Sequence, residues 1–249
     1  MNLSVYRKNQ QARGQFNGGE ILENKPIGFP REGGHLKPYS NLFYWSHAWS
    51  DGGSTIGLHP HQGFEILSFV YEGSIEHFDD GANEWKKLNT GAAQIIRSGK
   101  GISHSEKLNP GAHMFQIWLD PNLSETLQIP ASYNDYALSE FPVINENGIE
   151  KVIYAGEKSP MKMYTKGVDI QQLSINKGVH QIALDENKIY SIYIMQGSLK
   201  VNNEELEQDD FFLLSDENKV EINATEKLDL FLLANPKKVD YFTYAQQMM

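Results

Sequence analysis

The sequence contains no cysteine among its 249 residues. This absence excludes disulfide bonds, thiolate catalysis, zinc ribbons and iron–sulfur clusters together. Any metal that the chain binds must therefore be held by nitrogen and oxygen ligands. A chain without disulfides also fits a reducing compartment, so we expect a cytoplasmic location.

The sequence also lacks long apolar runs and an excess of basic residues. No stretch approaches the roughly 18 uninterrupted apolar residues that a membrane helix needs. The N-terminal stretch, MNLSVYRKNQQ, has neither the apolar core nor the cleavage site of a secretory signal. The 22 Lys and Arg residues are outnumbered by 32 Asp and Glu residues, and the formal net charge is −10. Because nucleic-acid binding depends on neutralising phosphates with basic side chains, we expect neither direct nucleic-acid binding nor membrane binding.

Helical periodicity is scarce, and short runs rich in Ile, Val, Phe, Tyr and Leu are instead broken by Gly, Asn, Asp or Pro. Such runs, joined by tight turns, are typical of strands in an antiparallel sandwich or barrel. We expect strands over residues 64–71, 74–78, 84–88, 93–97, 102–107 and 114–119, with a turn over residues 79–83.

A similar series follows later in the chain, with expected strands over residues 189–195, 198–201, 211–214 and 227–234. The fold class is therefore predicted to be all-β, with two antiparallel β-barrels in one chain. Residues 1–145 would form the N-terminal barrel with its linker, and residues 146–249 the C-terminal barrel. The polar residues 122–160 are expected to be the linker, with short helical turns, and residues 239–249 a terminal helix.

Two pairs of side chains carry the chemistry that the composition leaves open. His59 and His61 flank Pro60, which favours an extended chain, so both imidazoles should point to one face. His104 and Glu106 repeat this spacing. On neighbouring strands the two pairs would form a site of three nitrogens and one oxygen, with room for water or substrate. Ligands of this kind suit iron, nickel, copper, manganese, cobalt or zinc.

A lone pair of histidines at this spacing is more often a surface feature than a ligand set. Here, however, glycines frame both pairs and mark turns that would bring the pairs together. They are Gly53 and Gly73 around the first pair, and Gly91, Gly99 and Gly101 before the second. The framing favours the metal site.

The segments around both pairs resemble the pirin family of the cupin superfamily. The resemblance rests on GLHPHQGFEILSFVYEGSIEHFDD at residues 57–80, SGKGISHSEKLNP at 98–110 and FQIWLDP at 115–121. It is strong over most of residues 33–121 and reaches the second barrel only in outline. It implies a bicupin of two jelly-roll barrels.

The same resemblance implies one divalent metal ion, with Fe(II) preferred over Ni, Cu, Mn, Co or Zn. It assigns the four metal ligands to His59, His61, His104 and Glu106. Glu65 competes with Glu106 for the fourth position, because many other cupins use a glutamate at that spacing. The match of the second pair to pirins favours Glu106, and Glu65 is then expected to orient a histidine.

Other positions depart from the family or stand outside its motif. Gln62 replaces an arginine that commonly follows the first histidine pair, and Gly91-Ala92 replaces a Gly-Asp turn. His77 is a further candidate for the cavity wall. The remaining histidines lack a partner pair, so we expect them to be structural or exposed. They are His35, His47, His113 and His180.

The second barrel is expected to bind no metal. Aligning its turns with those of the first barrel places Ala183, Asp185, Glu221 and Asn223 at the four ligand positions. None of these residues is a histidine, so we expect this barrel to be structural.

The resemblance implies two functions of different classes. One is an oxidoreductase of the quercetin 2,3-dioxygenase type, which takes a small phenolic substrate and O₂ and uses Glu106 as a catalytic acceptor for the substrate hydroxyl proton. The aromatic residues Phe43, Tyr44, Trp45 and Trp49 would then be apolar walls or ordinary core. The alternative is a non-enzymatic, metal-dependent regulator that binds a protein partner, as described for animal pirin. The acidic chain and Gln62 favour the enzyme.

Overall fold

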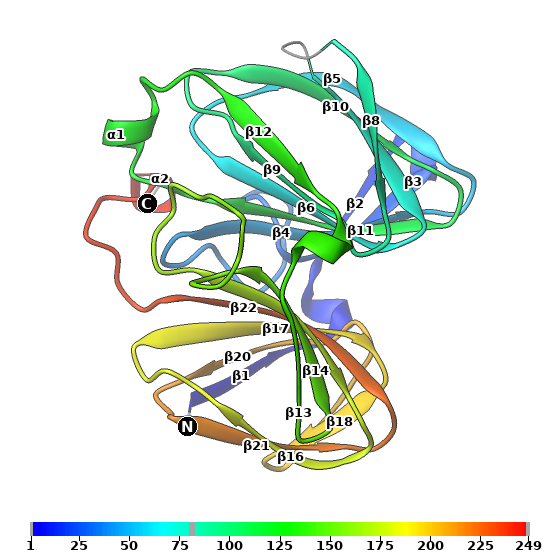
Figure 1. The fold of residues 1–249 in the computed structure, drawn as a ribbon, viewed down its shortest axis with the longest axis vertical. Coiled ribbons are helices and arrows are strands. Elements are labelled where there is room, and N and C mark those ends of the chain that lie inside the picture. The colour runs from blue at the N-terminus through cyan, green and yellow to red at the C-terminus, as the bar shows by residue number, and fades with distance from the viewer. Residues whose placement is uncertain (1, 80–82, 248–249) are drawn as a thin grey trace. The chain divides into compact units, whose positions relative to one another are not determined.

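The computed structural model describes residues 2–79 and 83–247, and most of them lie in antiparallel β-strands (Figure 1). The chain folds as two compact units. The N-terminal unit comprises residues 11–140, 161–166 and 239–249, and the C-terminal unit comprises residues 1–10, 141–160 and 167–238. The domain limits 1–145 and 146–249 remain a prediction.

The N-terminal unit contains two antiparallel sheets. The seven-stranded sheet has the order β12-β9-β6-β11-β4-β3-β2 and the four-stranded sheet the order β5-β10-β7-β8. The larger sheet consists of β2 (Ala12–Phe16), β3 (Ile21–Ile27), β4 (Leu42–Ser50), β6 (Glu65–Glu72), β9 (Ala93–Arg97), β11 (Ala112–Leu119) and β12 (Ser132–Tyr136). The smaller sheet consists of β5 (Ser54–His61), β7 (Ser74–Asp79), β8 (Trp85–Asn89) and β10 (Ile102–Leu108).

Part of the interior of the N-terminal unit is a compact apolar core to which both sheets contribute. Its buried side chains are Ile21, Ala48, Val70, Ile75, Leu88, Ala92, Leu108, Ala112 and Met114. Gly73, at the turn between β6 and β7, has φ 70°, and a Cβ there would lie 3.0 Å from Gly111 O. Only glycine tolerates both conditions, so this residue fixes the hairpin. The other framing glycines, Gly53, Gly91, Gly99 and Gly101, also have positive φ, as expected of turns.

The C-terminal unit repeats the same arrangement. Its seven-stranded sheet has the order β1-β20-β17-β22-β15-β14-β13, and its four-stranded sheet the order β16-β21-β18-β19. The larger sheet consists of β1 (Asn2–Tyr6), β13 (Val143–Glu146), β14 (Ile149–Ala155), β15 (Asp169–Ile175), β17 (Lys188–Gln196), β20 (Phe211–Ser215) and β22 (Leu228–Pro236). The smaller sheet consists of β16 (Gly178–Ala183), β18 (Ser198–Val201), β19 (Glu204–Glu207) and β21 (Lys219–Ala224).

The interior of the C-terminal unit is filled with apolar side chains from both of its sheets. They include Leu173, Ile192, Leu199, Leu206, Leu214, Ile222 and Leu230, all at most 2% exposed. Burial of this apolar surface is the main stabilising contribution to such a barrel. Together the two units confirm the predicted all-β class with two antiparallel barrel-like sheet pairs.

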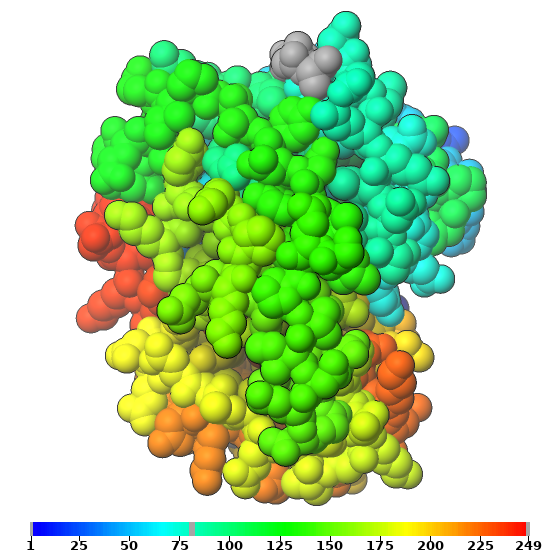
Figure 2. Space-filling view, viewed as in Figure 1, coloured from blue at the N-terminus to red at the C-terminus, as the bar shows by residue number. Residues whose placement is uncertain are grey.

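Each strand predicted from the sequence is present, and β9 and β18 have the predicted bounds, 93–97 and 198–201. The expected linker is in part wrong. It contains one short helix, α1 (Leu123–Thr126), but also the strands β12, β13 and β14. β12 and β13 lie at sheet edges, where one side of the strand faces solvent and polar residues are tolerated. The green segment of the chain that includes β13 lies on the face shown in Figure 2.

The expected terminal helix over residues 239–249 is reduced to α2 (Tyr244–Gln247), and residues 248–249 lie outside the described part of the chain. Residues 80–82, within the expected turn over 79–83, lie outside it as well. No helix in residues 2–79 and 83–247 is long and apolar enough to cross a membrane.

Candidate metal centre

The two predicted ligand pairs lie on adjacent strands of the four-stranded sheet. β5 carries His59 and His61, and β10 carries His104 and Glu106. The strands pair antiparallel, with His104 directly opposite His59 and, after a register shift, Glu106 opposite Ile56. The alternation of side chains along β5 then places His59 and His61 on the same face.

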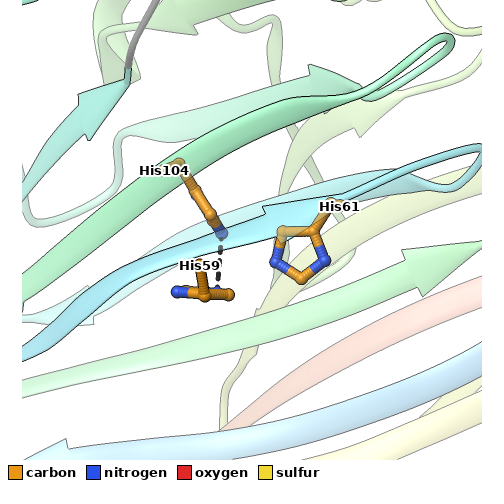
Figure 3. A group of neighbouring side chains, drawn as sticks. All are labelled: His59, His61 and His104. Atoms are coloured by element: carbon orange, nitrogen blue, oxygen red, sulfur yellow. Dashed lines mark hydrogen bonds between the residues drawn. The ribbon is translucent and has the colours of Figure 1, made fainter.

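The three imidazoles converge (Figure 3). Ligand atoms of His59, His61 and His104 all lie within 4.8 Å of one another. The Nε2 atoms of His59 and His104 are 3.1 Å apart. Metal–nitrogen bonds of about 2.1 Å at right angles would place two nitrogens about 3 Å apart, so this spacing fits ligands of one ion.

The protonation of the histidines also fits metal binding. His59 Nδ1 lies 2.8 Å from Gly57 O, and an N–H donated there leaves a lone pair on the Nε2 that faces His104. Burial, helped by the neighbouring imidazoles, lowers the pKa of both His61 and His104 from 6.5 to about 3. They are therefore neutral, the form in which imidazole binds a metal. His61 Nε2 is buried and has no hydrogen-bond partner in the described structure.

Glu106 lies beside this group rather than within it. Its side chain is almost completely buried, and its Oε1 accepts a hydrogen bond from Ser68 Oγ at 3.2 Å. Its Oε2 accepts one from Gln116 Nε2 at 2.7 Å. Trp118 Nε1 donates to Gln116 Oε1 at 3.2 Å. Because the indole only donates, the Gln116 amide must turn its NH₂ toward Glu106, whose carboxylate is thereby held as an acceptor.

A cavity of about 390 Å³ opens at the centre, a volume in the range of small-molecule sites. His59, His61 and Glu106 line it. The other lining residues are mostly apolar or aromatic and include Phe16, Phe29, Tyr44, Ile56, Leu108, Met114, Gln116 and Trp118. The ring of Trp118 meets that of His61 edge-on, with centroids 4.8 Å apart. Trp118 thus contacts one proposed ligand directly and another through Gln116.

Of the four aromatic residues expected as walls, Tyr44 lines this cavity. Phe43 is buried and packs on Phe64, with centroids 4.6 Å apart, and Trp45 is fully buried. Trp49 lies on β4 directly opposite His113 on β11. The sequence did not indicate four further lining residues, because nothing in their local pattern shows which cavity they reach; they are Phe16, Phe29, Gln116 and Trp118.

The prediction that Glu65 orients a histidine is wrong. Glu65 is fully buried, and its two carboxylate oxygens accept hydrogen bonds from the backbone N–H groups of Tyr164 at 2.7 Å and Thr165 at 2.8 Å. Burial raises its pKa despite these bonds. Glu65 therefore anchors the segment 161–166 to the N-terminal unit.

The remaining histidines have other partners. His77 is buried, with Nε2 3.2 Å from Asp79 Oδ2, and its ring centroid lies 5.4 Å from that of His104. His47 and His113 were expected to lack a partner pair, but His47 Nε2 lies 3.1 Å from His113 Nδ1. The sequence separation of 66 residues hides this pair, which the pairing of β4 with β11 creates.

Gln62 and His180 have backbone partners. Gln62, which departs from the family pattern, donates to Lys100 O at 3.0 Å. In the C-terminal unit, the ring nitrogens of His180 lie 3.2 and 2.7 Å from backbone oxygens of Asn147 and Asn176. Neither residue lines the cavity.

A continuous polar row crosses the seven-stranded sheet beneath Glu106. Its members, each directly opposite the next on the neighbouring strand, are Asp135, Gln94, Ser68, Gln116 and Ser46. Directly opposite residues lie on the same face of a sheet. Ser68 and Gln116 contact Glu106, whereas Ser46 Oγ donates to Glu23 Oε1 at 2.9 Å. The polar row therefore connects Glu106 to a second charged group in the cavity.

That second group is a triad of Glu23, Lys25 and Glu32, all of which line the cavity. Lys25 Nζ lies 3.0 Å from Glu23 Oε2 and 2.7 Å from Glu32 Oε1. The lysine side chain is 4% exposed. None of these three residues was predicted from the sequence.

Comparison with known proteins agrees with this geometry. Residues 35–119, which include all four proposed ligands, match the family model described as Pirin. The match makes residues 35–119 similar to a Pirin domain. The chain is 29% identical to an Escherichia coli protein named quercetin 2,3-dioxygenase over 174 residues, which are 67% of this chain and 70% of that protein. It is 26% identical to human Pirin over 60% of this chain and 53% of that protein.

Solved structures extend the likeness beyond these residues. The crystal structure of the bacterial pirin YhhW from Escherichia coli in complex with nickel(II) has a TM-score of 0.75, and the match covers 96% of this chain and all of that one at 23% identity. At that identity the match establishes the fold alone. It confirms the bicupin architecture expected from the pirin resemblance.

Proposed function

We propose that the Pirin-like domain of this chain holds one divalent metal ion through His59, His61, His104 and Glu106, and that the protein is a dioxygenase acting on flavonol-type phenols. The observation that carries the proposal is the convergence of three imidazoles, two of which line a mostly apolar cavity. Relatives named quercetin 2,3-dioxygenase support the same reaction class. We expect Fe(II) and a cytoplasmic location, with nickel the first alternative because a structural relative was solved with it.

The bound ion would act as a Lewis acid on the adjacent hydroxyl and carbonyl oxygens of a flavonol. Glu106, whose Oε2 accepts a hydrogen bond from Gln116, would accept the proton of the substrate hydroxyl. The rings of Phe29, Tyr44 and Trp118 would hold the planar substrate and exclude water. In the overall reaction one O₂ adds to the flavonol, the central ring opens and one carbon monoxide leaves.

The test follows quercetin absorbance, oxygen uptake and carbon monoxide release by protein loaded with iron, nickel, copper, manganese or cobalt. We expect turnover with at least one metal, and its loss on chelation. His180→Ala, which changes a histidine in the C-terminal unit, is the matched control for His59→Ala. If no metal supports turnover, the enzymatic proposal fails.

A metal-dependent regulator that binds a protein partner is the second candidate, and the similarity to human Pirin favours it. It would bind the metal at the same residues, so metal binding without turnover would be its signature.

A further inference from the structure

The cavity has a second polar wall, formed by the triad of Glu23, Lys25 and Glu32, which the proposed metal chemistry does not use. Two of the three ammonium protons of Lys25 are directed to the carboxylates of Glu23 and Glu32. The ammonium also lies 5.9 Å from the ring centroid of Phe29 and 5.7 Å from that of Tyr44, both on the cavity wall. Burying a lysine among aromatic rings is costly, and a purely structural position could be filled by an apolar residue.

Glu23 is the fixed member of the triad. Its Oε1 accepts hydrogen bonds from Tyr44 Oη and Ser46 Oγ, both at 2.9 Å, and its Oε2 faces Lys25. Burial and the nearby Glu23 carboxylate raise the pKa of Tyr44, so this hydroxyl stays protonated and remains a donor. Three donors therefore hold the Glu23 carboxylate in place, and Glu23 in turn positions Lys25.

Glu32 is the accessible member of the triad. Its side chain is 30% exposed, and its Oε2 accepts the backbone N–H of Phe29 at 2.9 Å. Each carboxylate oxygen can accept two hydrogen bonds, so Glu32 keeps acceptor capacity beside Lys25. The wall thus offers one donor and one acceptor next to each other.

The charges of the triad select the chemical class of the ligand group. Two carboxylates around one ammonium give a net charge of −1, so a ligand carboxylate or phosphate would be repelled. A ligand ammonium that approached Glu32 would lie beside the ammonium of Lys25 and be repelled by it. A neutral hydroxyl can donate to Glu32 and accept from the third proton of Lys25.

We propose that the triad is a recognition site for a phenolic hydroxyl of the substrate, remote from the group that reaches the metal centre. It makes Lys25 and Glu32 specificity-determining residues that favour polyhydroxylated flavonols over the unsubstituted 3-hydroxyflavone. This inference rests on the proposed function for the substrate class. It is nevertheless tested by binding, which does not require turnover.

The experiment measures the affinities of quercetin and of 3-hydroxyflavone for the metal-loaded protein by isothermal titration calorimetry. Hydrogen bonds to charged groups contribute enough for a preference of about 10-fold or more for quercetin in the wild type. Lys25→Met and Glu32→Gln should each reduce this ratio toward one while leaving the affinity for 3-hydroxyflavone nearly unchanged. Lys188→Met removes a lysine that is ion-paired to Asp169 in the C-terminal unit, and it should keep the wild-type ratio.

Glu32→Gln guards against misfolding of Lys25→Met, because Glu32 lies at the accessible edge and glutamine keeps its size and one acceptor oxygen. A wild type that binds the two flavonols equally, or binds neither, overturns the inference. So does an unchanged ratio in a folded Glu32→Gln protein. If the ratio falls as expected but no metal supports oxygen uptake, the recognition site stands and the dioxygenase proposal fails alone.

Discussion

Gln116→Leu removes the amide that joins Trp118 to Glu106. The substitution deletes the 2.7 Å bond to the Glu106 carboxylate and leaves the indole N–H of Trp118 without its acceptor. A hydrogen bond to a charged group contributes about 1.5–3 kcal/mol, and a donor left unsatisfied costs about 1–3 kcal/mol when fully buried and less at the half-buried indole of Trp118. Leucine regains some apolar burial, so we expect the free energy of unfolding to fall by about 2–4 kcal/mol.

The same substitution should weaken metal binding, because Gln116 sets the orientation of a proposed ligand. Loss of such a supporting contact typically lowers metal affinity by about 10–100-fold. Competition with a fluorescent chelator measures this affinity, and thermal unfolding of the metal-free protein by circular dichroism measures stability separately.

Gln94→Leu is the matched control. Gln94 belongs to the same polar row, is buried, and donates to Asp135 Oδ1 at 2.6 Å, but it has no contact with Glu106. It should lose comparable stability and keep the wild-type metal affinity within about two-fold. Equal metal affinities in Gln116→Leu and wild type, or an equal loss in Gln94→Leu, would refute the reasoning.

Three further predictions concern single residues. His104→Ala should abolish tight metal binding, so elemental analysis should find no bound ion, whereas the wild type and His180→Ala should each hold one ion per chain. An ion that remains bound in His104→Ala would contradict the prediction that the C-terminal barrel binds no metal. Glu106→Gln should bind metal through the three histidines more weakly than the wild type. At saturating metal it should lose most turnover, because the amide cannot accept the substrate proton, so a normal kcat would remove Glu106 from the mechanism. Burial raises the pKa of Asp120 from 3.8 to about 6, so the folded state binds its proton more tightly than the unfolded state does. The free energy of unfolding of the wild type should therefore fall as pH rises from 4 to 6. Asp120→Asn lacks this titration, so its stability measured by urea unfolding should rise relative to that of the wild type over the interval, by at most about 3 kcal/mol. Parallel pH profiles of the two proteins would contradict this.

The sequence predicted the parts of the fold that depend on local pattern. Apolar runs between turn residues predicted β9 and β18 correctly, and the two ligand pairs lie on adjacent strands. The strands of the expected linker were missed because β12 and β13 are short, polar edge strands. Their pairing partners, not their own composition, make them strands.

The contacts around the centre depend on register, which the sequence does not reveal. Glu65 is separated from Tyr164 by 99 residues, and Glu23 meets Tyr44 and Ser46 only when β3 and β4 lie side by side. Gln116 was recognisable as part of a family-like segment, but its bond to Glu106 follows from the packing of one sheet on the other. Non-local partners of this kind require coordinates.

The polar row has a consequence for how substitutions combine. It contacts Glu106 through Ser68 and Gln116, and it contacts Glu23 through Ser46. Gln116 and Ser46 lie directly opposite each other, so neighbouring members of one row contact the metal centre and the lysine triad. Double-mutant cycles between Gln116 and Ser46 should therefore give a coupling energy different from zero, although neither residue contacts the other's carboxylate. A substitution near the metal centre would then change the energetic effect of a substitution near the triad. A change of substrate specificity would therefore be reached more readily by paired substitutions than by single ones.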